Sequence, residues 1–216
     1  MPIITVAQRK GGVGKTTIAI CMTAELARRG HRVALVDGDP QRSACQWAEL
    51  GNLEFPVYEI GLGSEPVARW ARDVKNVKAD IVVVDTAPNE REMGASIAIA
   101  NVMLVPCTAS GLDIEATVHT IGIIDAVRKR RAEPIRVLLV PNRVDRRSLE
   151  GRQLVDELKQ FEENIAPAIT NRSAFVRAFA VGQSVATFAP NAPADLEIRA
   201  LTDVVEKALG ARRITK

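Results

Sequence analysis

The chain of 216 residues is poor in cysteine and has no C-x-x-C pair. Its cysteines, Cys21, Cys45 and Cys107, are odd in number and lie far apart. Disulfide frameworks and zinc sites need cysteines at paired or close spacings, so this pattern argues against both. We expect all three thiols to be packing residues.

Long apolar runs are also absent. No stretch of 18 or more apolar residues occurs, and the first residues lack a basic stretch followed by an apolar segment. Membrane spans and signal peptides need those features, so we expect neither, and we expect a cytoplasmic protein. Internal repeats, low-complexity tracts and linkers rich in Gly, Ser or Pro are missing too. We therefore expect residues 1–216 to form one domain.

The net charge of +3 conceals an uneven distribution along the chain. Residues 1–127 hold 12 Lys and Arg against 15 Asp and Glu, whereas residues 128–216 hold 17 against 11. The second part of the chain is therefore where we expect a polyanion to bind.

Several short runs are continuous, apolar and rich in β-branched residues, which is typical of strands covered on both faces. They are residues 3–7, 32–37, 80–85, 102–107 and 135–141. Helical patterns alternate with them, at residues 15–29, 65–77, 92–100, 113–131, 148–163 and 194–209. This alternation predicts an α/β fold with a mostly parallel, twisted sheet and helices on both faces. Residues 55–60 and 165–170 are weaker candidate strands.

Polar segments follow four of the predicted strands. They are residues 10–17, 37–41 and 85–89, together with Asn142. Ligands of open α/β sheets collect beyond the carboxyl ends of the strands, so we expect these segments to converge on one rim.

The segment "GGVGKTT" predicts a phosphate-binding loop that opens a helix. It fits the pattern G-x-x-x-x-G-K-[ST] only in part, because the first glycine of that pattern would fall at Arg9. Glycines still allow the backbone N–H groups to point at phosphate oxygens at a helix N-terminus. The residues expected to bind the nucleotide are Gly11, Gly12, Val13, Gly14, Lys15, Thr16 and Thr17.

Each side chain of this loop has an expected task. Lys15 neutralises the β- and γ-phosphates, and the Thr16 hydroxyl binds Mg²⁺. Thr17 is placed to reach the α-phosphate. A turn rich in glycine without a ligand is the alternative, but strand, loop and helix occur here in the order that a phosphate site needs.

Acidic residues stand at the ends of two predicted strands. Asp37 and Asp39, in "DGDP", point to opposite sides of an extended segment and should have different tasks. Asp37 suits a water-mediated contact with Mg²⁺, although either carboxylate could instead cap the helix that starts near Gln41. Asp85 ends an apolar strand, where an unpaired carboxylate is costly unless a cation or donor is present. We therefore expect Asp85 to be a metal-site acid.

The combination of "KGGVGKTT", "VDGDPQ" and "VVVDTAP" resembles the deviant Walker-type ATPases of the ParA/MinD superfamily over nearly the whole chain. The short length without an N-terminal helix-turn-helix region and the segment "TNRSAFVRAFAVGQSV" are most similar to the small plasmid-partition ParA proteins, ParF among them. The resemblance implies a single-domain P-loop NTPase fold, with ATP and Mg²⁺ as ligands.

The resemblance also implies roles for individual residues. Lys10 would cross to the nucleotide of a partner subunit, so that two chains sandwich two ATP molecules, as an arginine finger acts in trans. Asp39 would orient or activate the attacking water. Residues 86–92 would sense the γ-phosphate. Asn142 would offer its amide to the adenine edge, and the loop "FAPNAPADL" would line the adenine site.

Small ParA proteins bind DNA without sequence preference through basic residues of their later region, which here would be Arg172 and Arg177. Helical periodicity separates these two by roughly 140°. The run "RKRR" at 128–131 closes a helix, where cations are favourable without a partner. The end of the chain, "ARRITK", is a further candidate. Trp47 and Trp70 are expected to be packing residues.

These features predict an ATP-dependent partitioning ATPase in the cytoplasm, associated with the nucleoid. ATP would close the homodimer, the dimer would bind DNA, and a ParB-like protein or cargo adaptor would stimulate hydrolysis. The cargo would be a plasmid or chromosome; a protein microcompartment or a chemoreceptor cluster is the alternative.

Three rival functions each lack a feature. A MinD-like membrane regulator would end in a basic amphipathic helix, but the last residues hold no aromatic and include acids. An electron carrier like nitrogenase reductase needs paired cluster cysteines, which Cys107 alone does not supply. An enzyme that amidates cobyrinate has a companion glutaminase domain, which is absent here.

Overall fold

The computed structural model describes residues 1–109 and 111–210. Its centre is a seven-stranded sheet in the order β3-β2-β4-β1-β5-β6-β7, in which every described pairing is parallel. The strands are β1 (Ile3–Val6), β2 (Val33–Asp37), β3 (Val57–Glu59), β4 (Ile81–Asp85), β5 (Val102–Cys107), β6 (Arg136–Pro141) and β7 (Asn164–Ile165). The predicted sheet is confirmed.

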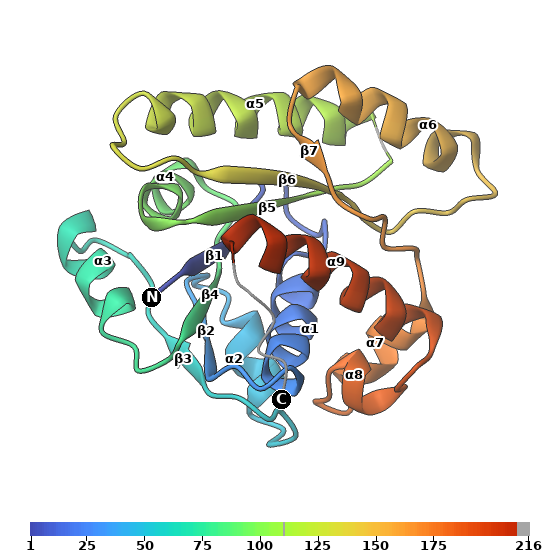
Figure 1. The fold of residues 1–216 in the computed structure, drawn as a ribbon, viewed down its shortest axis with the longest axis horizontal. Helices are drawn as coiled ribbons and strands as arrows, with labels where there is room; N and C mark the ends of the chain where they lie inside the picture. The colour runs from blue at the N-terminus through green and yellow to red at the C-terminus, as the bar shows by residue number, and fades with distance from the viewer. Residues whose placement is uncertain (110, 211–216) are drawn as a thin grey trace.

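Helices cover both faces of this sheet (Figure 1). One layer holds α1 (Lys15–Arg28), α2 (Ser43–Ala48), α7 (Ser173–Ala180), α8 (Val185–Phe188) and α9 (Pro193–Leu209). The other layer holds α3 (Val67–Lys75), α4 (Glu90–Ile99), α5 (Gly111–Arg128), α6 (Leu149–Leu158) and the 3-10 helix η1 (Lys159–Phe161).

The two layers arise from the alternation of side chains along fully buried strands. On β1, Ile4 and Val6 pack into the core with α1 and α9, whereas Ile3 packs into the opposite core. Since successive residues of a strand point to opposite faces, an uninterrupted apolar run supplies both cores at once.

The weaker candidate strands differ from expectation in their length. Residues 55–60 contain β3, but in place of a strand at 165–170 the sheet has β7, which ends at Ile165. Pro167 lies two residues further on, and proline has no N–H to donate to a ladder. Further along, Thr170 makes only an isolated bridge to Val144.

The predicted helix at 148–163 also ends early. α6 stops at Leu158, η1 carries one further turn, and Glu162 has a left-handed backbone with φ 54°. A non-glycine residue in that region ends a right-handed helix. The short helices α2 and α8 span too few residues to show a helical period in the sequence.

The cysteines and tryptophans pack as expected. Cys21, Cys45 and Cys107 are all buried, and none of them forms a disulfide among the described residues. Burial raises the pKa of the Cys21 thiol to about 12, and burial beside Asp37 does the same for Cys45. Trp47 and Trp70 are also buried. Among the described residues, no helix is long and apolar enough to cross a membrane.

Candidate functional site

The loop between β1 and α1 has the backbone that its glycines permit. Gly12 and Gly14 have φ of 76° and 94°, in the left-handed region, and Gly14 is the N-cap of α1. The side chain of Asn142, at the end of β6, donates from Nδ2 to the Val13 carbonyl at 2.6 Å. A Cβ on Gly14 would overlap Asn142 Nδ2. Asn142 therefore holds the loop, a contact that its expected adenine role did not include.

Lys15 opens α1 and is only 7% exposed. Its Nζ donates to the Lys10 carbonyl oxygen at 3.1 Å. Burial lowers the pKa of Lys15, while the charges of Asp85 and Asp39 act in the opposite direction. The ammonium group thus lies beside the loop with few partners, where a phosphate would satisfy it.

Asp85 and Thr16 are joined across the rim, with Thr16 Oγ1 donating to Asp85 Oδ2 at 2.6 Å. Asp85 is 1% exposed, and its Oδ1 has no hydrogen-bond partner among the described residues. Burial raises the pKa of Asp85 to about 7; the Thr16 hydrogen bond opposes the shift, and the nearby Asp37 charge adds to it. An orphaned, buried carboxylate oxygen beside a hydroxyl fits a hard cation such as Mg²⁺.

Asp37 lies beside Asp85, because the two are Cα partners in the register of β2 and β4. Within the described residues, no group of three or more His, Cys, Asp or Glu gathers as a metal cage. Mg²⁺ commonly takes only one or two carboxylates and fills its other positions with water and phosphate oxygens. The two carboxylates at this rim fit this way of binding Mg²⁺.

The two carboxylates of "DGDP" have different partners. Asp37 accepts from the backbone N–H of Asp39 at 3.1 Å and of Cys45, in the first turn of α2, at 2.9 Å. Asp39 accepts from the Gln41 N–H at 2.9 Å and forms a local turn. The capping alternative therefore applies to Asp37, whereas Asp39 faces a cavity.

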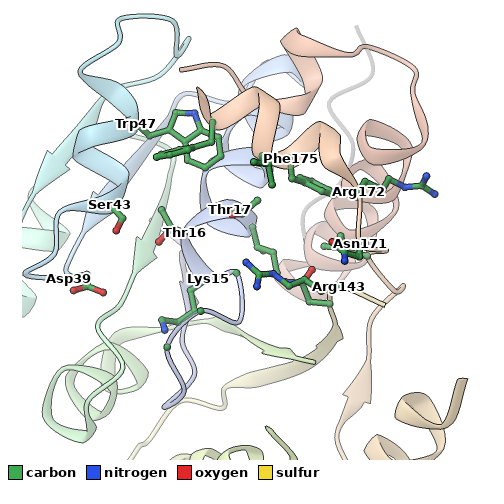
Figure 2. A pocket seen from close by; sticks show the side chains of 18 of the residues that line it. Lys15, Thr16, Thr17, Asp39, Ser43, Trp47, Arg143, Asn171, Arg172 and Phe175 are labelled. Carbon is green, nitrogen blue, oxygen red and sulfur yellow. The ribbon is translucent and has the colours of Figure 1, made fainter. Parts of the chain in front are cut away.

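That cavity measures about 720 Å³ and opens over the loop (Figure 2). The predicted residues that line it are Gly11, Gly12, Gly14, Lys15, Thr16, Thr17, Asp39, Asn142 and Arg172. The predicted residues that do not line it are Lys10, Val13, Asp37, Asp85 and Arg177. Its size lies within the range of small-molecule sites.

One wall of the cavity was not predicted. Trp47, Phe175 and Phe179 line it, and Trp47 meets Phe179 edge to face at 5.0 Å between centroids. These aromatics come from α2 and α7, which are far apart in the sequence, so no local pattern pointed to them. Arg143 is another missed residue: it has φ 53°, and its side chain lies between Lys15 and Asn171 in Figure 2.

Most of the predicted basic residues have structural partners. Arg172 donates to Glu197 Oε1 at 2.9 Å, and the guanidinium of Arg177 lies 5.3 Å from the centre of the Phe188 ring. In "RKRR", Arg128 pairs with Asp125 and Glu163, and Arg131 donates to carbonyls at the end of α4. The candidate "ARRITK" lies outside the described residues.

Two further expectations have a structural outcome. The loop "FAPNAPADL" contributes no residue to the cavity wall, although the family resemblance implies that it lines the site of the adenine base.

Cys107 is fully buried, and its thiol donates to the Val105 carbonyl at 3.2 Å. A buried thiol of this kind is not presented to a metal cluster at the surface.

Comparison with known proteins identifies the family. The sequence profile described as "CobQ/CobB/MinD/ParA nucleotide binding domain" matches residues 4–185. The maintenance of carboxysome distribution protein A of Gloeobacter kilaueensis is 34% identical over 182 residues, covering 82% of this chain and 77% of that protein. The chromosome-partitioning ATPase Soj of Thermus thermophilus is 28% identical over 235 residues, covering 94% of each.

Solved structures share the fold at low identity. Cyanothece McdA has a TM-score of 0.78 at 19% identity, covering 97% of this chain and 100% of that one. Aquifex aeolicus MinD also has a TM-score of 0.78, at 17% identity, and covers 100% of both chains. The fold is therefore that of the MinD/ParA P-loop NTPases. The extent of the profile match and the identity to the carboxysome distribution protein show that this chain belongs to the CobQ/CobB/MinD/ParA nucleotide binding domain family.

Proposed function

We propose that this protein is a Mg²⁺-dependent ATPase that partitions or positions a cargo. One observation carries the proposal: Lys15, the Thr16–Asp85 pair and Asp39 surround a single glycine loop at the mouth of one cavity. This set provides a cation for the phosphates, oxygen ligands for a metal and a carboxylate that faces the cavity. A McdA variant of Cyanothece was solved with ATP, and a MinD of Pyrococcus horikoshii with Mg-ADP.

In the proposed reaction, backbone N–H groups of residues 11–17 and the Lys15 ammonium hold the phosphates at the start of α1. Thr16, Asp85 and Asp37 would hold Mg²⁺, which neutralises charge on the transferring phosphate. Asp39 accepts a proton from, or orients, the attacking water. Lys10 of a second copy supplies a further cation.

The proposed cycle couples this chemistry to movement. ATP closes two chains into a homodimer, the dimer binds DNA of any sequence, and hydrolysis releases it. A ParB-like protein or a cargo adaptor accelerates hydrolysis, so release occurs near the cargo. The protein would then act in the cytoplasm on nucleoid DNA.

Two cargoes have support from relatives. A plasmid or chromosome is supported by 27% identity to the ParA protein of Rhizobium radiobacter and by the identity to Soj. A protein compartment is supported by 34% and 32% identity to carboxysome distribution proteins of Gloeobacter kilaueensis and Halothiobacillus neapolitanus. The identity of the neighbouring gene would distinguish them, since a small DNA-binding protein and a shell protein lead to opposite conclusions.

The proposed function is tested by ATP binding and ATP-dependent retention on duplex DNA. We expect Lys15→Ala to lose both, because the loop amides alone cannot neutralise the β- and γ-phosphates. Titration calorimetry and DNA co-sedimentation measure the two effects. Lys159→Ala is the matched control, since Lys159 pairs with exposed Asp156 and does not line the cavity. Unchanged ATP affinity in Lys15→Ala would contradict the assignment of the loop.

A further inference from the structure

The connection between β6 and α6, together with the first turn of α6, is unusually rich in arginine. Residues 143–152, which we name the arginine loop, hold Arg143, Arg146, Arg147 and Arg152 against Asp145 and Glu150. All four arginines are exposed. Figure 1 shows that the chain between β6 and α6 projects beyond the end of the sheet.

Three of these four arginines have no side-chain partner among the described residues. In the part of the chain that the structure describes, no hydrogen bond, ion pair or ring contact holds the guanidinium of Arg143, Arg146 or Arg152. Arg147 pairs with Asp145 at 3.1 Å and is 92% exposed. By contrast, Arg172 is committed to Glu197. Unpaired, exposed guanidinium groups are free to bind phosphate.

The loop is held in a fixed shape beneath these side chains. Ser148 donates to the Asp145 carbonyl at 3.0 Å and accepts from the Gly151 N–H at 3.0 Å, which caps α6. A Cβ on Gly151 would overlap the Asp145 carbonyl, so the turn is closely packed. Val144 also exchanges backbone hydrogen bonds with Ile169 and Asn171. The arginines are therefore presented by a rigid turn, which reduces the entropy cost of binding.

The same loop is connected to the nucleotide site at its first residue. Asn142 directly precedes it and donates to the Val13 carbonyl of the phosphate loop. Arg143 itself lines the cavity. A change in the phosphate loop on ligand binding would therefore move the root of the arginine loop.

We propose that the arginine loop is the surface through which this protein contacts the phosphate backbone of duplex DNA, and that Asn142 links this contact to the bound nucleotide. This inference rests on the proposed function, because it names the surface that carries the DNA binding proposed there. It moves the main contact away from Arg172 and Arg177, towards a loop in which three of the four arginines have no side-chain partner among the described residues.

Duplex DNA fits the loop better than an anionic membrane does. Beyond the loop, α6 carries exposed Asp156 and half-buried Glu157, and these acids would repel a flat anionic surface. Leu149 is the one large apolar side chain that the loop exposes, and membrane binding through an interface needs a wider apolar face. The phosphate backbone of duplex DNA is a narrow ridge, so it can contact the arginine loop without approaching the acids on α6.

The test is the affinity of the full chain for a fluorescent duplex of arbitrary sequence, with a non-hydrolysable ATP analogue, across a salt series. We expect Arg146→Gln with Arg152→Gln to weaken binding about tenfold and to lower the salt slope by about 0.9 per lost phosphate contact. Basal ATPase activity without DNA is expected to be unchanged, since neither residue lines the cavity.

The matched control is Arg72→Gln with Arg130→Gln, which removes the same charge from two other exposed arginines without partners in the described residues. If both double variants weaken binding equally, only net charge matters and the inference is wrong. If wild type does not bind DNA at all, the proposed function fails instead. If the variant keeps DNA binding but loses binding to phosphatidylglycerol vesicles, the loop is a membrane surface and the inference is overturned.

Discussion

At the residue scale, the site consists of charged groups that the protein itself buries. Lys15, Asp37 and Asp85 are 7%, 1% and 1% exposed, although each carries a charge in the proposed reaction. Burying a charge is costly unless it is paired, so these groups lower the stability of the fold around them. A nucleotide with Mg²⁺ supplies the missing opposite charges, and its binding is correspondingly favoured. The pKa of Asp85, near 7, has the same origin.

One substitution can separate the role of Asp39 from the roles of the neighbouring site residues. The Asp39 carboxylate lines the cavity and, within the described residues, accepts a hydrogen bond only from the Gln41 N–H, so Asp39→Ala should leave the loop and the metal ligands in place. Loss of a catalytic acid–base group lowers the rate by on the order of 10² or more. We expect the variant to accumulate as an ATP-bound dimer that stays on DNA, measured by phosphate release and light scattering.

A structural role for Asp39 gives a different result. Losing one turn hydrogen bond costs about 1 kcal/mol and leaves turnover nearly normal. Glu65→Ala is a matched control, because the Glu65 carboxylate forms an ion pair with exposed Arg69 and does not line the cavity. A less stable Asp39→Ala protein with ordinary phosphate release would rule out a catalytic role.

The residues of the site differ in how far the sequence could predict them. Lys15 and Thr16 follow from a short local motif, since a glycine loop before a helix has few other uses. The hydrogen bond from Asn142 to Val13 joins residues 129 positions apart, and the aromatic wall joins α2 with α7. Such contacts depend on how helices pack, which no local spacing encodes.

At the scale of elements, charged residues join the last turns of α1 to α9. Asp195, fully buried at the start of α9, accepts from Arg28 at 2.9 Å and from Arg199 at 2.6 Å. Arg29 bonds to Asp203 and Glu206, and His31 to Glu206. Because α1 begins at the phosphate loop, this network anchors the helix that positions Lys15.

Asp195→Asn should therefore destabilise the fold. Burial alone would raise the pKa of Asp195, but hydrogen bonds from Arg28, from the Asn191 N–H and from Arg199 outweigh it and lower the pKa. Breaking a buried pair costs about 3 kcal/mol. A carboxylate whose pKa is lowered in the folded protein stabilises the fold at pH values above its unfolded pKa of about 3.9. This contribution is lost as the pH falls through the folded pKa.

Urea unfolding at several pH values measures this contribution. We expect the difference between wild type and Asp195→Asn to be constant near neutrality and to shrink below about pH 4. Asp156→Asn is the control, since the exposed Asp156–Lys159 pair contributes less than about 1 kcal/mol. Equal losses in both variants would show that Asp195 has no special role between α1 and α9.

The elements themselves were predictable where their pattern was long. Buried parallel strands such as β4 and β5 appear as continuous β-branched runs, and α9 has a clear helical period ended by Gly210. The two-residue β7 and the four-residue α8 have no such pattern. Their conformation is set by their neighbours: β7 pairs with β6, and α8 packs against α1.

At the scale of the whole molecule, the proposed ATPase needs two copies of the chain. Lys10 does not line the cavity of its own chain, although its carbonyl accepts from Lys15. This arrangement agrees with a Lys10 side chain that serves the nucleotide of a partner, while Asp39 serves the nucleotide of its own chain. The two residues would then belong to the same active site only across an interface.

Mixing two inactive variants tests this directly. Lys10→Ala should bind ATP but not hydrolyse it, and Asp39→Ala should be equally inactive. In a mixed dimer, the site on the Lys10→Ala chain keeps its own Asp39 and receives Lys10 from the other chain, so it is complete. Random pairing in an equal mixture, made before ATP is added, should therefore recover about a quarter of wild-type activity, because half of the dimers carry one working site of two. If Lys10 acts within its own chain, each mixed dimer has two defective sites, and the mixture stays as inactive as its components.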